Sequence, residues 1–179
     1  MVVSLLKSWT ANPETYGPVS KAPAVSAPPS LATIKTKQLG AWASSNYAIV
    51  GTTLQIVGEQ LCETIDLKSI SKVLNVAAGN GNATLVAPCR FCDVTSTDYV
   101  DTLLDRGATR VDAEGLSVKF QTCDAENLPF ANHTQDVVIS TFGVMLTPDQ
   151  PKAASRLIRV IKPGGKIALA NWTPVSFIR

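Results

Sequence analysis

The chain has 179 residues, of which 45% are hydrophobic and 17% are charged, and its formal net charge is +2. This size and composition predict one globular domain with a sizeable core, and so small a charge without a run of Lys or Arg argues against nucleic-acid binding. No apolar run reaches membrane-spanning length, and the N-terminus MVVSLLKSW lacks the features of a secretory signal. We therefore expect a cytoplasmic protein without an integral membrane segment.

The chain divides once by composition. Residues 11–30 combine proline with serine and alanine, which predicts a flexible arm over residues 1–30. Residues 31–179 are expected to form the ordered domain.

Within that domain, helical and strand patterns alternate. Helices are expected over 47–64, from Asn82 to about Ala87, over 99–113 and over 149–161. Strands are expected over 72–77, 91–97, 117–122, 136–141 and 166–171, with a turn at Pro163-Gly164-Gly165 before the last. This alternation predicts parallel βαβ units. The expected fold is α/β, with a doubly wound, mostly parallel sheet.

Four cysteines occur, at positions 62, 89, 92 and 123, and they fit reduced thiols better than a disulfide framework. Cys89 and Cys92 form a C-x-x-C pair, but a zinc site would need a second pair of ligands. The sequence offers none, and its one histidine, His133, lies in a polar loop segment. No metal site is predicted.

The strand at 72–77 runs into the glycine-rich turn Gly79-Asn80-Gly81. In doubly wound sheets ligands bind at the carboxyl ends of the strands, where glycine lets the backbone approach a ligand closely. Asp98 ends the next strand, where a carboxylate suits the two ribose hydroxyls of an adenosine, although a strand-end or helix-cap role fits Asp98 as well. Thr84 stands where a dinucleotide-binding fingerprint would have its third glycine, which disfavours NAD.

Five segments follow in order: VLNVAAGNGNAT (73–84), TSTDYV (95–100), QTCDAENLPF (121–130), DVVISTFGVML (136–146) and RVIKPGGKIALANW (159–172). Together they resemble the motif series of class I S-adenosylmethionine-dependent methyltransferases, and the subgroup they look most like is that of the ubiquinone/menaquinone C-methyltransferases. The resemblance covers about residues 40–179. It implies a Rossmann-like methyltransferase fold, S-adenosylmethionine as cofactor and a small or lipid-like methyl acceptor.

The resemblance also implies roles for individual residues in cofactor binding. The loop with Ala77, Gly79, Asn80 and Gly81 would lie against the methionine moiety, and Asp98 would take the ribose hydroxyls with Tyr99 beside the adenine. Asp124 would accept from the adenine amino group, although a turn role is equally open, and Ala125 would offer its backbone N–H to the ring. Ser140, with Thr141 and Phe142, would line the mouth that faces the sulfonium and the acceptor.

Asn75 departs from the family pattern, which usually has an acidic residue there to orient the cationic end of the cofactor. Asparagine keeps an acceptor but loses the charge, so weaker cofactor binding is expected; the alternative is a local hydrogen bond. No catalytic residue is predicted, because His133, Asp136 and Glu126 qualify as a base by residue type alone.

The family fold has two further strands, usually an antiparallel hairpin, after the strand at 166–171, whereas only TPVSFIR follows here. The sequence thus looks like a C-terminally truncated member with five strands and an exposed edge. A homodimer through this edge is expected, since the proline-rich arm would donate poorly to a strand ladder. The alternatives to an active enzyme are a catalytically impaired domain that binds the cofactor or a partner and, less favoured, an NAD-binding oxidoreductase.

Overall fold

The structure, a computed structural model, describes residues 29–44 and 48–173. Most of the predicted arm lies outside the described residues, so its boundary with the domain stays a prediction. No helix in the described part of the chain is both long enough and apolar enough to cross a membrane.

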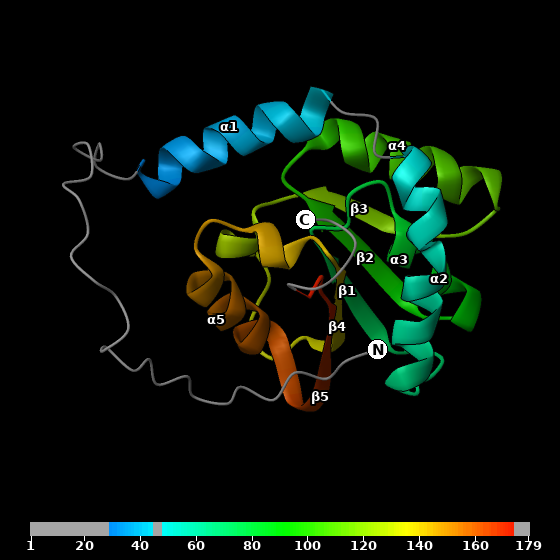
Figure 1. The fold of residues 1–179 in the computed structure, drawn as a ribbon. Coiled ribbons are helices and arrows are strands. Elements are labelled where there is room, and N and C mark those ends of the chain that lie inside the picture. The colour runs from blue at the N-terminus through cyan, green and yellow to red at the C-terminus, as the bar shows by residue number, and fades with distance from the viewer. Residues whose placement is uncertain (1–28, 45–47, 174–179) are drawn as a thin grey trace, which may run out of the picture.

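A five-stranded sheet forms the centre of the domain (Figure 1). Its strands are β1 (Lys72–Val76), β2 (Asp93–Asp98), β3 (Lys119–Thr122), β4 (Gln135–Thr141) and β5 (Ile161–Ala170). Their order is β3-β2-β1-β4-β5 and all neighbouring strands are parallel. The order reverses between β1 and β4, which creates a switch point there. The predicted doubly wound parallel sheet is confirmed.

The helices follow the predicted alternation, with one addition. They are α1 (Leu31–Ser44), α2 (Ala48–Thr64), α3 (Asn82–Val86), α4 (Asp101–Ala113) and α5 (Gln150–Val160). In Figure 1, α5 covers one face of the sheet, whereas α2, α3 and α4 lie on the other side. The sequence did not predict α1, which lies across the ends of the strands (Figure 1).

Two apolar clusters, one on each face, hold the helices to the sheet. Leu74 and Val138 pack with Leu157 and Val160 of α5 on the first face. Val73, Val137 and Ile139 pack with Ala83 and Ala87 on the second, where Leu61 of α2 joins them. Successive strand residues therefore point to opposite faces, as the pleat requires, and both faces are covered, as is usual for a parallel sheet.

The last strand begins earlier than predicted. β5 starts at Ile161, which is opposite Gln135 of β4, but the next aligned pair is Val137 with Lys166. The segment at residues 162–165 is thus a bulge within the strand, and Gly164 has a φ of 79° there. The expected turn at Pro163-Gly164-Gly165 is therefore corrected to this bulge, because main-chain pairing to β4 exists on both sides of it. Among the described strands, β5 lies at one edge of the sheet.

Candidate functional site

A cavity of about 360 Å³ lies at the carboxyl ends of the strands. The segments that follow β1, β2, β3 and β4 each contribute to its wall, and α1 contributes three side chains, Lys35, Gln38 and Trp42. This is the edge at which doubly wound sheets bind ligands.

The loop after β1 forms the part of this wall nearest the switch point. Ala77 and Gly79 have φ values of 51° and 56°, in the left-handed region that glycine adopts readily and alanine rarely. A Cβ atom built on Gly143 would lie 2.2 Å from the carbonyl oxygen of Ala77. Only glycine at position 143 therefore lets the loops after β1 and β4 touch behind the cavity.

Asp98 joins the loop after β1 to the end of β2. Its side chain is 5% exposed, and its two carboxylate oxygens accept from the backbone N–H groups of Gly79 (2.9 Å) and Val100 (3.0 Å). Burial raises the pKa of the Asp98 carboxyl, although these N–H donors oppose the shift. Each oxygen of a carboxylate has lone pairs for two donors, so Asp98 keeps acceptor capacity at the cavity wall.

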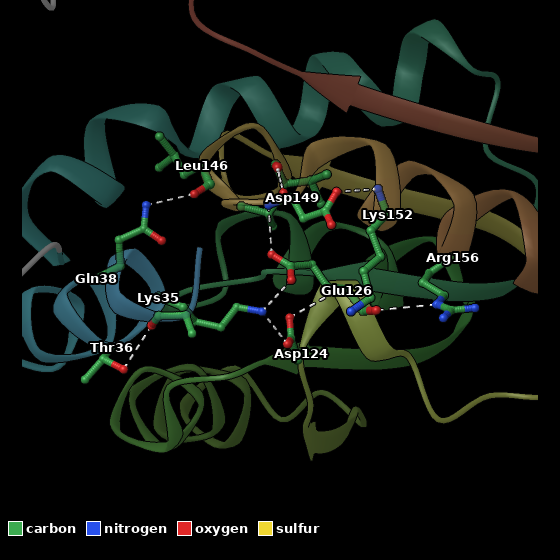
Figure 2. A network of polar contacts seen from close by, with 12 residues as sticks. Lys35, Thr36, Gln38, Asp124, Glu126, Leu146, Asp149, Lys152 and Arg156 are labelled. Carbon is green, nitrogen blue, oxygen red and sulfur yellow. Dashed lines mark hydrogen bonds and ion pairs between the residues drawn. The ribbon is translucent and has the colours of Figure 1, made fainter. Parts of the chain in front are cut away.

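Asp124 lies after β3 and belongs to a network of charges. Its Oδ1 accepts from the N–H of Glu126 (2.9 Å), as the cap of the short 3-10 helix η2 (Ala125–Asn127). Its Oδ2 lies 2.5 Å from Lys35 Nζ, which also contacts Glu126 Oε2 at 2.7 Å (Figure 2). This carboxylate therefore faces both the cavity and α1.

Seven of the ten residues predicted for cofactor binding line the cavity: Ala77, Gly79, Asn80, Asp98, Tyr99, Asp124 and Ala125. The remaining three, Asn75, Gly81 and Ser140, are outside its lining. Gly81 precedes α3, and a Cβ there would lie 3.4 Å from Gly107 Cα, so it lets α3 approach α4. The buried hydroxyl of Ser140 accepts from the N–H of Val144 (3.2 Å), while its neighbours Thr141 and Phe142 do line the cavity.

Asn75 is fully buried under α3 rather than directed toward the cavity. Its Nδ2 donates to Thr84 Oγ1 (2.9 Å), which lies 2.7 Å from Ser96 Oγ. Its Oδ1 is buried without a hydrogen-bond partner among the described residues. The pleat explains this placement, because residue 75 shares a face with Val73, the face that α3 covers. The geometry thus favours the local hydrogen bond over the cofactor contact.

Sequence reasoning missed the part of the wall that α1 and the end of β5 provide. Phe142 and Trp172 stack with ring centroids 4.2 Å apart and planes at 14°, and both line the cavity. Lys35, Gln38 and Trp42 lie three and four positions apart, a helical spacing that places them on one face. That spacing was the available signal, but without an apolar stripe it did not predict a helix.

The three residues considered as a catalytic base, His133, Asp136 and Glu126, lie outside the cavity lining. His133 precedes β4 and its Nδ1 lies 2.9 Å from the carbonyl oxygen of Ile161, at the opposite end of the sheet. Asp136 accepts from the N–H of Lys72, the first residue of β1, at that same end. Glu126 is near the cavity but is 6% exposed and is paired with Lys35. Neither His133, Asp136 nor Glu126 lines the cavity.

Known proteins share this fold and sequence pattern. An uncharacterized protein of Mycobacterium tuberculosis is 39% identical over 137 residues, which is 76% of this chain and 50% of that protein. A demethylmenaquinone methyltransferase of Clavibacter sepedonicus is 28% identical over 143 residues, 76% of this chain and 58% of that one. The chain thus spans about half the length of the curated relatives it matches.

The crystal structure of a SAM-dependent methyltransferase from Aquifex aeolicus superposes with a TM-score of 0.64 at 19% identity, over 84% of this chain and 77% of that one. The likeness shows the fold. A family model described as "Methyltransferase domain" matches residues 74–169, which is just over half of the chain and includes the carboxyl ends of β1, β2, β3 and β4. The chain therefore belongs to the class I S-adenosylmethionine-dependent methyltransferase domain family.

Proposed function

We propose that this domain transfers a methyl group from S-adenosylmethionine to an uncharged, small or lipid-like acceptor. The family implies S-adenosylmethionine as co-substrate. The observation that carries the proposal is the Asp98 carboxylate, which lies at the end of β2, lines the cavity and is held by the N–H of Gly79. One buried group thus fixes the glycine-rich loop and presents an acceptor suited to ribose hydroxyls.

The residues around the cavity fit this co-substrate. A Cβ built on Gly79 would meet nothing within 4 Å, so the backbone there leaves open space beside Asp98. Asp124 offers a second acceptor after β3, for the amino group of the adenine, and the N–H of Ala125 follows it. In this assignment the ends of β2 and β3 would hold the adenosine, and the loop after β1 would hold the methionine part.

Methyl transfer from a sulfonium asks little chemistry of the protein. The donor is already activated, so the protein supplies proximity, orientation and exclusion of water. The tight contact between Gly143 and Ala77, and the stacked rings of Phe142 and Trp172, give that end of the cavity a fixed wall.

The cavity wall differs in charge from one end to the other. Its charged side chains are Lys35, Asp98 and Asp124, which lie on α1 and at the ends of β2 and β3. The wall at the ends of β4 and β5 consists of uncharged residues: Thr141, Phe142, Gly143, Leu146, Thr147, Pro148 and Trp172. An ionised acceptor would be desolvated there without a charged partner among the described residues, which is costly. This wall supports an uncharged acceptor.

The relation to the demethylmenaquinone methyltransferase of Clavibacter sepedonicus supports the ubiquinone/menaquinone C-methyltransferase-like subgroup. The alternative is a domain that binds the cofactor without turnover. What favours it is the absence of histidine, and of any carboxylate besides Asp98 and Asp124, from the described cavity wall. A carbon acceptor needs a base, and both of these carboxylates are assigned here to the cofactor.

We further propose that residues 1–30 act as a separate arm and that the protein is cytoplasmic. Among the described residues no strand pairs with the outer side of β5, which supports association through this strand, with a second copy of the chain as the partner.

A turnover assay tests the proposal. The full chain is incubated with methyl-labelled S-adenosylmethionine and two matched sets of acceptors, uncharged phenols or quinols and charged amines, and S-adenosylhomocysteine formation is measured. We expect label in the uncharged set only. Transfer to the charged amines alone would overturn the acceptor class, and cofactor binding without transfer to either set would favour the non-catalytic alternative.

A further inference from the structure

Helix α1 is attached to the domain mainly by polar contacts. None of its residues is fully buried, and its half-buried cavity-lining residues, Lys35, Gln38 and Trp42, share one face. Gln38 Nε2 donates to the carbonyl oxygen of Leu146 (3.0 Å). A helix that buries so little apolar surface gains little from the hydrophobic effect, so individual side-chain contacts decide where it lies.

Lys35 makes the strongest of these contacts. Its Nζ lies 2.5 Å from Asp124 Oδ2 and 2.7 Å from Glu126 Oε2, so one ammonium joins two carboxylates (Figure 2). Burial by itself lowers the pKa of Lys35, but the hydrogen bonds and charges of these carboxylates outweigh it and raise the pKa above 10.5. Lys35 is therefore charged at neutral pH.

The carboxylates belong to the body of the domain and are held there independently of α1. Glu126 Oε1 accepts from the N–H of Asp149 (3.1 Å), and Asp149 in turn caps α5 by accepting from the N–H of Lys152 (3.0 Å). Asp124 Oδ1 accepts from the N–H of Glu126. Two like charges are thus fixed side by side at the N-terminal end of η2, and Lys35 reaches them from α1 (Figure 2).

The ion pair between Lys35 and Asp124 shares a residue with the proposed cofactor site. Asp124 is the carboxylate assigned to the adenine amino group, so Lys35 fastens α1 at the adenine end of the cavity. The side chains of Lys35 and Asp124 are 28% and 33% exposed. The side chain of Glu126, the second partner, is only 7% exposed. The pair with Asp124 is partly exposed on both sides, and such pairs contribute modestly to stability, which suits a contact that must form and break repeatedly.

We propose that Lys35 is the latch of a lid: its ion pairs with Asp124 and Glu126 hold α1 across the cofactor cavity, and the cofactor enters and leaves when this contact breaks. This inference rests on the proposed function, since it concerns how the cofactor reaches the same site. It predicts a specific kinetic pattern. Weakening the latch should speed association and dissociation by the same factor, because both pass through the open state, and should leave the affinity nearly unchanged.

The test uses the full chain, S-adenosylhomocysteine as the probe and stopped-flow tryptophan fluorescence, since Trp42 lines the cavity. Lys35→Met removes the charge but keeps most of the stem, and we expect both rate constants to rise about fivefold to tenfold. Lys37→Met is the matched control, because Lys37 lies on the same helix but is exposed; its rates should stay within about twofold of the parent's. Lys35→Arg keeps the charge, so its association and dissociation rates should stay close to those of the parent protein.

The outcomes separate the latch from other roles. A faster dissociation with an unchanged association rate would make Lys35 a direct ligand contact and overturn the lid. Equal rates in Lys35→Met and Lys37→Met, with binding intact, would overturn the latch alone. A parent protein that does not bind S-adenosylhomocysteine would overturn the proposed function and this inference with it. Circular dichroism of each variant verifies that the helices are retained.

Discussion

Replacing Asp98 by asparagine should weaken the binding of S-adenosylmethionine and S-adenosylhomocysteine while leaving the fold in place. The substitution keeps the shape of the side chain but removes its charge and turns one acceptor oxygen into a donor amide. Hydrogen bonds to a charged group contribute about 1.5–3 kcal/mol, and the loss of that contribution corresponds to an increase of about 10- to 150-fold in Kd.

The same substitution also has a structural cost that must be measured separately. The new amide must face the N–H of either Gly79 or Val100, because Asp98 now accepts from both. A lost hydrogen bond of this kind costs about 1–3 kcal/mol in the free energy of unfolding. Part of this loss is offset, because burial disfavours the ionised carboxyl in the folded protein and asparagine carries no charge to desolvate.

Isothermal titration calorimetry gives the affinity and urea denaturation gives the stability. Asp93→Asn is the matched control: Asp93 begins the same strand, is 46% exposed and pairs with Lys119 (2.8 Å) at the opposite end of the sheet. It should change neither quantity by more than about 0.5 kcal/mol. An Asp98→Asn protein that unfolds normally and binds with the parent's affinity would refute the assignment of Asp98 to the cofactor site.

Asp98 also predicts a pH dependence. Its folded pKa is raised above 3.8 by burial, so between those two values the folded state holds more protons than the unfolded state. Stability should therefore decline as pH rises through this window. Cofactor affinity should instead increase as pH rises through this window, because ribose hydroxyls donate to the ionised carboxylate. It should weaken as pH falls through the raised pKa. Asp98→Asn should abolish both dependences.

Other substitutions test the scaffold of the site. Asn75→Asp should lower the free energy of unfolding by about 3 kcal/mol, because it places a charge where burial is complete. Tighter cofactor binding in calorimetry would instead show that residue 75 contacts the cofactor. Gly143→Ala should abolish cofactor binding or soluble expression, since its Cβ would meet the Ala77 carbonyl oxygen at 2.2 Å, and a normal affinity would disprove that contact. Gly40→Ala, where a Cβ meets nothing within 4 Å, should raise thermal stability by up to about 1 kcal/mol. Sedimentation at micromolar concentration should give a homodimer, whereas a monomer with rapidly exchanging amides at 166–171 would mean that this edge is left bare.

Much of the sheet could be predicted from the sequence, because buried strands carry short apolar runs that are visible in the sequence. The segment at 136–141 carries the apolar run Val137-Val138-Ile139, as expected of a strand covered on both faces, and it became β4, which begins one residue earlier, at Gln135. The start of β5 in the segment at 161–165 could not be predicted from an apolar run. Its Pro-Gly-Gly run is typical of a turn, and only the pairing of Ile161 with Gln135 shows that the strand already begins before it.

The residues of the candidate site that lie at or just after strand ends could be predicted from the sequence. Those supplied by segments far away in the sequence could not. Asp98 is the last residue of β2 and Asp124 lies two residues after β3, so their meeting at one edge of the sheet follows from the topology. Lys35 stands 89 positions before Asp124, on a helix whose inner face is polar and so lacks the apolar periodicity that reveals helices. For Asn75 the family resemblance implied a contact with the cofactor, with a local hydrogen bond as the alternative, and the pleat directs the side chain beneath α3.

The central claim is that the cavity at the strand ends binds S-adenosylmethionine, and parallel calorimetric titration tests it most directly. The full chain is titrated with S-adenosylmethionine, S-adenosylhomocysteine and NAD, and each titration is repeated with Asp98→Asn and Asp93→Asn. We predict saturable binding of the first two ligands, no measurable binding of NAD, and a loss of affinity in Asp98→Asn alone. Binding of NAD in preference to both adenosyl ligands, or of no ligand by a folded protein, would contradict the account.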